Sequence, residues 1–454
     1  MTTDLTWLPA WQIRDLIEKR EVSPVEVTEH FLGRAEELDP ILKCYRTLDA
    51  KGAREQAKLA EEAVLGGDEL GLLHGIPVSV KEHIAVAGLP HFSLDVVAGA
   101  DTRSDRAERD APVVRRLRDA GAIVFGTNIM PGMGSVGLLD AGGNPTTDLS
   151  FHSRNPWDLA RVPGSSSAGG CAAVSGGVIP LAIGSDGGGS TRLPAAWSGL
   201  LGLHPTMGRV PMGSPPGNSW NTSLGPLTRN VRDGAMVLQA IAGPDGAEII
   251  SLQTDPPDYF VDLDAGVEGF RFAWTDDFGF ARKYAGAESE RVLDVARTAA
   301  QAFGQLGATV ETTDETLPDW TPMLGLGPQG TPGSNDAFVA GQDCRVVWWD
   351  GLRRVFAEHD LLVTTTIQHI AFTVERWDES WTKGLAEFAP QWCAHTFPHN
   401  FLGWPALSVP CGFVDGMPVS IQITGPPDSE PLIYRAANAF LSARPFDDRP
   451  PAVS

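Results

Sequence analysis

The pattern of apolar and polar positions divides the chain near residue 75. Before that point the pattern is helical: Ser23, Pro24 and Glu26 form a capping signal that predicts a helix to about residue 37, and a second helix is predicted over residues 50–63. After it, short apolar runs alternate with helical patterns, which is typical of α/β proteins.

The apolar runs predict the strands of a buried, mixed sheet in an α/β layer fold. They cover residues 76–80, 122–126, 178–183, 270–274, 361–365, 406–410 and 419–424. Helices are predicted between them at residues 112–120, 288–305 and 431–441. Stretches rich in proline and glycine lie at residues 211–217, 255–258 and 317–333. Because the strand pattern resumes after each stretch, we interpret them as surface loops of one domain, with residues 323–335 as a candidate rim of a binding cleft.

Composition and charge narrow the class of protein. The chain has 454 residues, of which 42% are hydrophobic and 20% charged, as in soluble globular proteins. Its formal net charge of −22 argues against nucleic acid and anionic membranes as partners. No apolar run approaches the roughly 18 residues of a membrane span, and the N-terminus lacks the pattern of a signal peptide, so we expect a cytoplasmic protein.

Cysteine and histidine usage does not indicate a metal centre. The histidines form no H-E-x-x-H motif, and the five cysteines form no C-x-x-C pair. These cysteines are Cys44, Cys171, Cys344, Cys393 and Cys411. We therefore expect neither a metal nor another cofactor.

The densest chemical signal is a block rich in glycine and serine over residues 163–209. In it Gly187, Gly188 and Gly189 precede Ser190, and successive glycines let backbone N–H groups turn toward one point, which suits an oxyanion or a phosphate. The chain has no G-x-x-x-x-G-K-[ST] phosphate loop. It also has no G-x-S-x-G motif, so a serine hydrolase would need a base other than the histidine of a nucleophile elbow.

Lys81 is a candidate for that base. The chain has seven lysines against 28 arginines, and Lys81 is the only lysine between Lys58 and Lys283. A buried lysine can lose its proton whereas an arginine cannot. Lowering a lysine pKa from about 10.4 to near 8 costs roughly 3 kcal/mol, which burial can impose. The alternative is a strand-end lysine that reaches for solvent.

Three segments together resemble the amidase signature family. They are HGIPVSVKEHIAVAG at residues 74–88, RNPWDLARVPG at residues 154–164, and the Gly/Ser block. The resemblance covers nearly the whole chain and implies one α/β/α sandwich domain over residues 1–454, with a large mixed central sheet. Its parts would be a helical segment at 1–70, the signature core at 75–250, a variable substrate-cleft region at 255–400, and a C-terminal sheet and helix at 401–454.

The resemblance implies a Ser–cis-Ser–Lys triad. Ser190 would be the nucleophile, Ser166 the serine of the cis peptide, and Lys81 the base. Ser166 lies 24 residues before Ser190, the separation that the family pattern requires. Ser167 would support this network.

The resemblance also implies the surroundings of the nucleophile. The backbone N–H groups of Gly187, Gly188 and Gly189 would form the oxyanion hole, the set of donors that stabilises the negative oxygen of the tetrahedral intermediate. The N–H of Ser190 itself is a further candidate donor. Asp186 and Arg192 would form a structural ion pair that braces the loop.

Substrate contacts are defined less closely. The segment of Met130, Gly132 and Met133 aligns with a family stretch that lines the acyl pocket, although core packing is the commoner use of methionine. Arg209 would lie at the pocket mouth or form a surface ion pair. One or two tryptophans of the variable region would face an aryl substrate and the others would be core: Trp348, Trp349, Trp377, Trp381 and Trp392.

The resulting expectation is a hydrolase that cleaves C–N bonds of amides and anilides through an acyl-enzyme. Resemblance to urethanase-like amidases and aryl acylamidases implies aryl carbamates as further substrates. The expected partner is a small amide or carbamate with an aryl group, and both a monomer and a homodimer stay open. The alternatives are an amidase without carbamate activity and the glutaminase subunit of a tRNA-dependent amidotransferase. A non-catalytic binding module would need a broken triad, and all three positions are filled.

Overall fold

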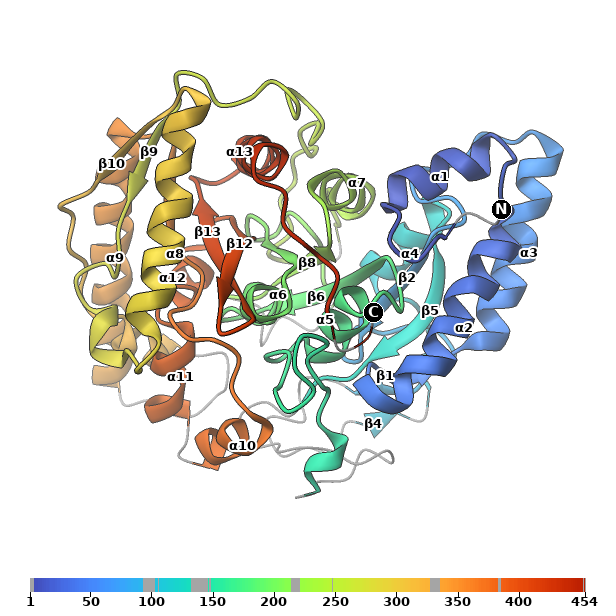
Figure 1. The fold of residues 1–454 in the computed structure, drawn as a ribbon, viewed down its shortest axis with the longest axis horizontal. Coiled ribbons are helices and arrows are strands. Elements are labelled where there is room, and N and C mark those ends of the chain that lie inside the picture. Colours follow the sequence, from blue (N-terminus) through green and yellow to red (C-terminus); the bar gives the residue numbers. More distant parts are fainter. Residues whose placement is uncertain are drawn as a thin grey trace.

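Eleven strands form one mixed sheet through the protein, shown in Figure 1. The computed structural model describes residues 4–92, 103–104, 106–131, 146, 148–213, 221–246, 248–326, 335–382, 385–451 and 453. In sheet order the strands are β1 (Tyr45–Leu48), β5 (Ile123–Asn128), β2 (Pro77–Lys81), β6 (Leu181–Asp186), β8 (Ser223–Thr228), β7 (Leu201–His204), β12 (Ala406–Val414), β13 (Met417–Thr424), β11 (Leu361–Thr365), β9 (Arg271–Trp274) and β10 (Thr309–Thr312). A separate small sheet pairs β3 (His91–Phe92) with β4 (Arg103–Ser104).

Helices surround this sheet (Figure 1). They are α1 (Ala10–Glu18), α2 (Pro24–Leu42), α3 (Ala50–Gly66), α4 (Pro112–Asp119), α5 (Ala168–Ser175), α6 (Arg192–Ser198), α7 (Val231–Ile241), α8 (Ser289–Gln301), α9 (Asn335–Glu358), α10 (Val374–Thr382), α11 (Leu385–Cys393), α12 (Phe397–Leu402) and α13 (Glu430–Ala443). In Figure 1, α2 and α3 lie at one end of the molecule and α9 lies at the opposite end, which holds β9 and β10. Over the described ranges, no helix combines the length and the apolar character needed to cross a membrane.

The sheet separates two hydrophobic cores. Along β11, Leu361 and Val363 belong to the larger core and Leu362 to the smaller one, and along β9 the neighbours Phe272 and Ala273 divide in the same way. Successive side chains of a strand point to opposite faces, so each face of the sheet needs its own cover. Among the covering helices, α6 packs against β7, β12 and β13, and α8 packs against β11, β12 and β13. The mixed sheet and its two covered faces confirm the predicted α/β/α sandwich.

The capping signal predicted for α2 is confirmed. Ser23 Oγ accepts a hydrogen bond from the N–H of Glu26 at 3.1 Å, and the Glu26 carboxylate accepts one from the N–H of Ser23 at 2.8 Å. The helix continues beyond the predicted end at residue 37, because Leu38 and Leu42 extend its buried face. It ends at Leu42, and Lys43 after it adopts a left-handed conformation with φ 53°.

Strands β7 and β8 are not predicted by the apolar pattern, because glycine and proline interrupt it. Gly225 of β8 lies so close to β7 that a Cβ atom would be 1.9 Å from the carbonyl oxygen of Leu203. Pro226, next to it, pairs with Ile183 of β6. These residues weaken the local strand signal, and it is the pairing with β6 and β7 that holds the segment extended.

The candidate chemistry lies where two parallel strands end. β2 and β6 are parallel neighbours, with Val80 paired with Ile183, so their carboxyl ends lie at the same edge of the sheet. Lys81 is the last residue of β2 and Asp186 is the last residue of β6. This register brings the candidate base to the glycine loop that follows β6.

The predicted cleft rim at residues 323–335 is described only in part. Thr321–Leu326 forms a 3-10 helix, and residues 327–334 lie outside the described ranges. Met323 is 0% exposed and belongs to the smaller core. Met323 therefore does not line a cleft, because its apolar side chain is covered by core residues.

Candidate active site

The side chain of Lys81 ends between two serines. Its Nζ lies 2.7 Å from Ser166 Oγ, 3.0 Å from Ser185 Oγ and 3.2 Å from the carbonyl oxygen of Ser185. Lys81 is 1% exposed, so it does not reach for solvent. A neutral amine has two N–H donors and one lone pair, so Ser185 can accept both N–H groups while the lone pair faces the Ser166 hydroxyl. This arrangement suits a proton transfer from Ser166 to Lys81.

The Lys81 amine is poised to lose its proton near neutral pH. Burial lowers the pKa of Lys81 to about 7, although the negative charge of Asp186 opposes the shift. An amine with such a pKa is about nine-tenths neutral at pH 8. The structure thus places the candidate base in hydrogen-bonding contact with Ser166.

Ser166 and Ser190 lie on two loops that are tied to each other. The peptide bond between Ser165 and Ser166 is cis. The N–H of Ser167 donates to the carbonyl oxygen of Ser190 at 3.1 Å, which joins the loops. Ser190 is 7% exposed, and its Oγ makes no hydrogen bond, to Ser166 or to any other residue that the structure describes. The hydroxyl of the candidate nucleophile is therefore not engaged by those residues.

The glycine loop before Ser190 differs from the implied oxyanion hole at one position. The N–H of Gly189 donates to Asp186 Oδ1 at 2.6 Å, so it is already used. The N–H groups of Gly187, Gly188 and Ser190 make no hydrogen bond within the described part of the chain. Gly189 therefore supports the loop in this conformation, and Gly187 and Gly188 are the glycines with N–H groups left for an oxyanion.

Asp186 and Arg192 form a fully buried ion pair, as the resemblance implies. Arg192 Nε lies 2.9 Å from Asp186 Oδ2, Nη2 lies 3.0 Å from Oδ1, and both side chains are 0% exposed. Burial alone would raise the pKa of Asp186, but the charge and hydrogen bonds of Arg192 hold it well below its usual range. Removing one partner of a buried pair costs about 3–5 kcal/mol. The pair therefore braces the loop that carries Gly189 and Ser190.

Three histidines are buried near this ion pair. Burial and the positive charge of Arg192 lower the pKa of His204 to about 4, and they lower the pKa of His399 well below its usual value. Burial also lowers the pKa of His395 to about 4. All three are therefore neutral at pH 7.

We expect acid to destabilise the fold below about pH 6.5. Burial gives His152, His204 and His395 folded-state pKa values of about 4, against about 6.5 in the unfolded chain. Between these values the unfolded chain binds protons that the folded chain does not. The free energy of unfolding therefore falls as the pH falls through this window, by about 2 kcal/mol for each histidine at pH 5. Urea unfolding at pH 7.5 and pH 5 measures this loss.

His152→Phe is a matched control for this prediction. The ring nitrogens of His152 have no hydrogen-bond partner among the described residues, so phenylalanine removes a titrating group and no hydrogen bond. Between pH 7.5 and pH 5 the variant should lose about 2 kcal/mol less than the wild type. A wild-type protein equally stable at both pH values would contradict the prediction.

A buried carboxylate holds the chain beside Lys81. Glu82, which is 1% exposed, accepts a hydrogen bond from Arg46 Nε at 2.7 Å and another from the N–H of Met130 at 2.5 Å. Met130 follows β5 by two residues, and the β5 residue Asn128 pairs with Lys81. The motifs do not point to Glu82 or Arg46. The available signal is an acidic residue directly after a buried strand and next to the candidate base.

The other predicted substrate contacts are only partly placed. Met130 is half-buried and its backbone is held by Glu82, whereas Gly132 and Met133 lie outside the described residues. The structure therefore brings Met130 near the end of β2 and leaves the other two as predictions.

Arg209 is engaged by groups other than the triad. Its guanidinium donates to Asp428 Oδ1 at 2.5 Å and to the carbonyl oxygen of Thr254 at 2.9 Å, and the residue is 2% exposed. Among the described residues, none of its hydrogen bonds reaches Lys81 or Ser190. These contacts favour the ion-pair alternative over a place at the pocket mouth. The expected position at the surface is wrong for Arg209 itself, because its side chain is buried and only its partner Asp428 is exposed.

The tryptophans of the variable region are mostly core, as expected. Trp348 and Trp377 are 0% exposed and Trp392 is 6% exposed. Trp349 is 45% exposed. The side chain of Trp381 lies outside the described residues. The three buried tryptophans belong to the smaller core, so they pack inside the protein.

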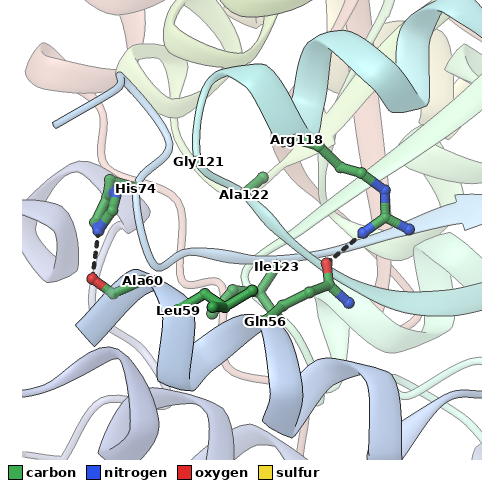
Figure 2. Close-up of a pocket in the computed structure, with 8 residues that line it drawn as sticks. All are labelled: Gln56, Leu59, Ala60, His74, Arg118, Gly121, Ala122 and Ile123. Carbon is green, nitrogen blue, oxygen red and sulfur yellow. Dashed lines mark hydrogen bonds between the residues drawn. The ribbon is translucent and has the colours of Figure 1, made fainter. Parts of the chain in front are cut away.

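A pocket of about 280 Å³ lies away from this chemistry, between α3 and the start of β5 (Figure 2). Arg118 Nη1 donates to Gln56 Oε1 at 2.5 Å at one side of it, and a ring nitrogen of His74 lies 2.9 Å from the carbonyl oxygen of Ala60 at the other. Ile123, which lines the pocket, is the first residue of β5. Because β5 is parallel to β2, the pocket and the Lys81 site lie toward opposite ends of these strands.

The chain is similar over its whole length to known amidases. The model of the family described as Amidase matches residues 26–318 and 310–433. An acylamidase of Rhodococcus erythropolis is 32% identical over 489 residues, covering 99% of this chain and 98% of that protein. A glutamyl-tRNA(Gln) amidotransferase subunit of Moorella thermoacetica is 33% identical over 506 residues, covering 99% of both. The crystal structure of a bacterial aryl acylamidase, an amidase signature enzyme, has a TM-score of 0.83 at 26% identity and covers 98% of both chains. This chain therefore belongs to the amidase signature family, which hydrolyses amides.

Proposed function

We propose that the protein cleaves aryl amides through an acyl-enzyme formed on Ser190. The observation that supports this most directly is the buried Lys81, which has a pKa of about 7 and lies 2.7 Å from Ser166 Oγ. A serine nucleophile needs a nearby base, and a partly neutral lysine serves as one at neutral pH. The loop tied to Ser166 carries Ser190.

The proposed reaction begins with two proton transfers. Neutral Lys81 takes the proton of Ser166, and Ser166 takes the proton of Ser190. At the same time Ser190 Oγ attacks the acyl carbon. Hydrogen bonds between catalytic groups often form only when substrate is bound, so the absent contact between the two serine hydroxyls is compatible with this relay.

The glycine loop would stabilise the tetrahedral intermediate. The N–H groups of Gly187 and Gly188 would bind the oxyanion, and each such donor is worth about 3 kcal/mol. The relay then returns a proton to the departing amine, so the C–N bond breaks as an ester forms on Ser190. Water attacks this ester by the same relay and releases the acid.

The proposed substrate class is supported by the similar proteins. The acylamidase supports amides as substrates, and the aryl acylamidase supports an aryl group on them. Aryl carbamates are part of the proposal because they present the same carbonyl and the same aniline leaving group to the triad. They differ by an alkoxy oxygen in place of a carbon on the acyl side, so the acyl pocket decides between them.

A second candidate is the glutaminase subunit of a tRNA-dependent amidotransferase. The observation that favours it is the similarity to the amidotransferase subunit of Moorella thermoacetica, with the same coverage of this chain as the acylamidase. Its substrate would be glutamine, and its partners would be other protein subunits and tRNA. The net charge of −22 makes direct contact between this chain and tRNA unfavourable.

A matched substrate panel tests these proposals. The purified chain is assayed with 4-nitroacetanilide, ethyl N-(4-nitrophenyl)carbamate, 4-nitrophenyl acetate and L-glutamine. The first two release the same 4-nitroaniline, so their rates compare the acyl side alone. We expect kcat/KM for the anilide to exceed that for glutamine by at least about 100-fold, and the carbamate to be turned over as well.

Each outcome of the panel assigns the protein differently. Turnover of the anilide without the carbamate would leave an aryl amidase and remove the carbamate proposal. Faster turnover of glutamine would favour the glutaminase of an amidotransferase. If none of the four is hydrolysed, the proposed amidase activity on aryl substrates is contradicted.

A further inference from the structure

We propose that Asn221, Thr396 and Asn400 form a clamp that aims the oxyanion donors of the glycine loop, an inference that rests on the proposed function. Two of the three lie in or next to α12, far along the chain from the Gly/Ser block. They do not touch the reacting atoms. They are positioning residues that act through the backbone before Ser190.

Three successive carbonyl groups of the loop, those of residues 186, 187 and 188, each accept a hydrogen bond from a buried side chain. The donors are, in that order, Asn400 Nδ2 at 2.8 Å, Asn221 Nδ2 at 2.5 Å and Thr396 Oγ1 at 2.8 Å. The exposures of these donors are 0%, 3% and 0%. Every C=O group in this run is therefore held by its own partner.

Holding a carbonyl group also fixes the N–H of the next residue. In a trans peptide the N–H points away from the C=O of the same planar unit. The carbonyl groups held by Asn400 and Asn221 therefore set the directions of the N–H groups of Gly187 and Gly188. These are the two glycine N–H groups that make no hydrogen bond within the described ranges. The third peptide unit is held by Thr396 at its carbonyl group and by Asp186 Oδ1 at its N–H. Gly188 therefore lies between two held peptide units, and losing the Thr396 hydroxyl would free the backbone that carries its N–H.

The clamp residues are linked to one another. Asn400 Nδ2 also donates to the carbonyl oxygen of Asn221 at 3.1 Å. Arg192 donates to Asn400 Oδ1 at 2.6 Å and to the carbonyl oxygen of Thr396 at 3.1 Å. The ion pair between Arg192 and Asp186 therefore braces the clamp as well as the loop.

Packing leaves the loop no room to turn. A Cβ atom on Gly188 would lie 2.8 Å from the ring of Phe397, and one on Gly189 would lie 2.3 Å from Thr396 Oγ1. Gly189 also has φ 123°, which L side chains rarely adopt. The glycines thus allow the segment at Thr396 and Phe397 to pack directly on the loop backbone.

A clamp of this kind acts on the transition state. Donors that are already aimed at the site of developing charge need no reorganisation during the reaction, which is where most electrostatic catalysis arises. Loosening them weakens binding of the oxyanion more than binding of the neutral substrate. A variant that loosens the clamp should therefore have a lower kcat and a nearly unchanged KM.

The test uses four variants measured with 4-nitroacetanilide. Asn221→Ala removes the donor to the carbonyl group of residue 187, and Thr396→Val removes a hydroxyl while keeping the shape of the side chain. Thr396→Ser keeps the hydroxyl. Asn438→Ala is the matched control. Asn438 lies on α13, and its Nδ2 also donates to a backbone carbonyl group, that of Leu263, at 3.0 Å.

We expect kcat to fall about 10- to 100-fold in Asn221→Ala and Thr396→Val, with KM within about 2-fold of the wild type. The inhibition constant of phenylboronic acid, which forms a tetrahedral adduct on a serine, should rise by a similar factor. Thr396→Ser should keep kcat within about 3-fold and Asn438→Ala within about 2-fold of the wild type. The rise of kcat/KM with pH should keep its midpoint in all four, because Lys81 is unchanged.

Several results would overturn the clamp. These are a kcat within 2-fold of the wild type in Asn221→Ala or in Thr396→Val, or an equal loss in Thr396→Val and Thr396→Ser. If Asn221→Ala does not fold, the two Thr396 variants decide. Failure of the proposed function is distinct, because it appears as no hydrolysis of the four panel substrates by the wild type, or as residual activity above about 1% in Ser190→Ala, whatever the clamp variants do.

Discussion

Ser190→Ala should lower kcat for 4-nitroacetanilide by about 10⁴-fold or more, because no acyl-enzyme forms without the nucleophile. The structure leaves Ser190 Oγ without a hydrogen bond to any described residue, so alanine removes chemistry and little else. The Ser190→Ala variant should have the same melting temperature as the wild type. Residual activity above about 1% of the wild type would contradict the assignment of the nucleophile.

Ser165→Ala is the matched control for this variant. Ser165 is 1% exposed, lies in the same Gly/Ser block, and its Oγ has no hydrogen-bond partner among the described residues. Its kcat should stay within about 3-fold of the wild type. Mass spectrometry after treatment with an aryl sulfonyl fluoride gives a second measurement, with one adduct expected on the wild type and on Ser165→Ala, and none on Ser190→Ala.

Lys81→Met should lower kcat/KM by about 10³-fold or more and remove its dependence on pH near neutrality. In the proposed mechanism the neutral amine is the active form, so kcat/KM should rise with pH through about 7 and level off above pH 8, because burial sets the pKa of Lys81 at about 7. Initial rates between pH 5 and pH 9 at low substrate concentration measure this profile. An optimum near pH 5 would rule out Lys81 as the base.

Lys81→Arg tests whether the reaction needs position 81 as a base or only as a positive charge. Arginine keeps a cation and hydrogen-bond donors at this position but cannot be deprotonated, so it should be as inactive as Lys81→Met. Activity above about a tenth of the wild type in Lys81→Arg would mean that the charge, and not the lone pair, is what the reaction needs.

Stability gives an independent measurement on the same lysine. The folded-state pKa of Lys81 is lowered from an unfolded value of about 10.4 to about 7, so at pH 7.5 the unfolded chain holds a proton that the folded chain has mostly lost. This difference favours unfolding by roughly 3–4 kcal/mol at pH 7.5. Methionine does not titrate and carries no such cost. Removing this cost offsets the stability that is lost with the hydrogen bonds from Lys81 to Ser166 and Ser185. Lys81→Met should therefore be inactive and no less stable than the wild type at this pH.

Local patterns predict those elements whose own residues carry the signal. The capping residues Ser23 and Glu26 form the expected hydrogen bonds, and the segment that begins with the apolar run 361–363 forms the expected strand β11. By contrast, β7 and β8 carry glycine and proline, and their extended form depends on neighbours in the sheet. Where neighbouring strands hold a segment extended, the sequence of that segment need not show the alternation of residues that predicts a strand.

The candidate site divides in a similar way. The contiguous Gly/Ser block and the isolated Lys81 point to an acyl-transfer site, and the structure brings Lys81, Ser166 and the loop of Ser190 together. The motifs do not reveal that Gly189 uses its N–H internally, because that depends on the side chain of Asp186 folding back on the loop.

The sequence by itself determines the class of chemistry in this protein. In the proposed mechanism the residue types at Lys81, Ser166 and Ser190 carry it, because a hydroxyl nucleophile and a deprotonatable amine are properties of the side chains. The α/β layering is determined in the same way, by the alternation of apolar runs with helical patterns.

Only the tertiary structure decides whether that chemistry can operate. The low pKa of Lys81 arises from burial at the edge of the sheet, where β2 and β6 end together. The direction of the glycine N–H groups depends on Asn400, whose side chain donates to the carbonyl oxygen of Asp186. The two residues are 214 positions apart in the sequence. Desolvation and hydrogen-bond geometry are set by groups that only folding brings into contact, and no local pattern of residues contains them.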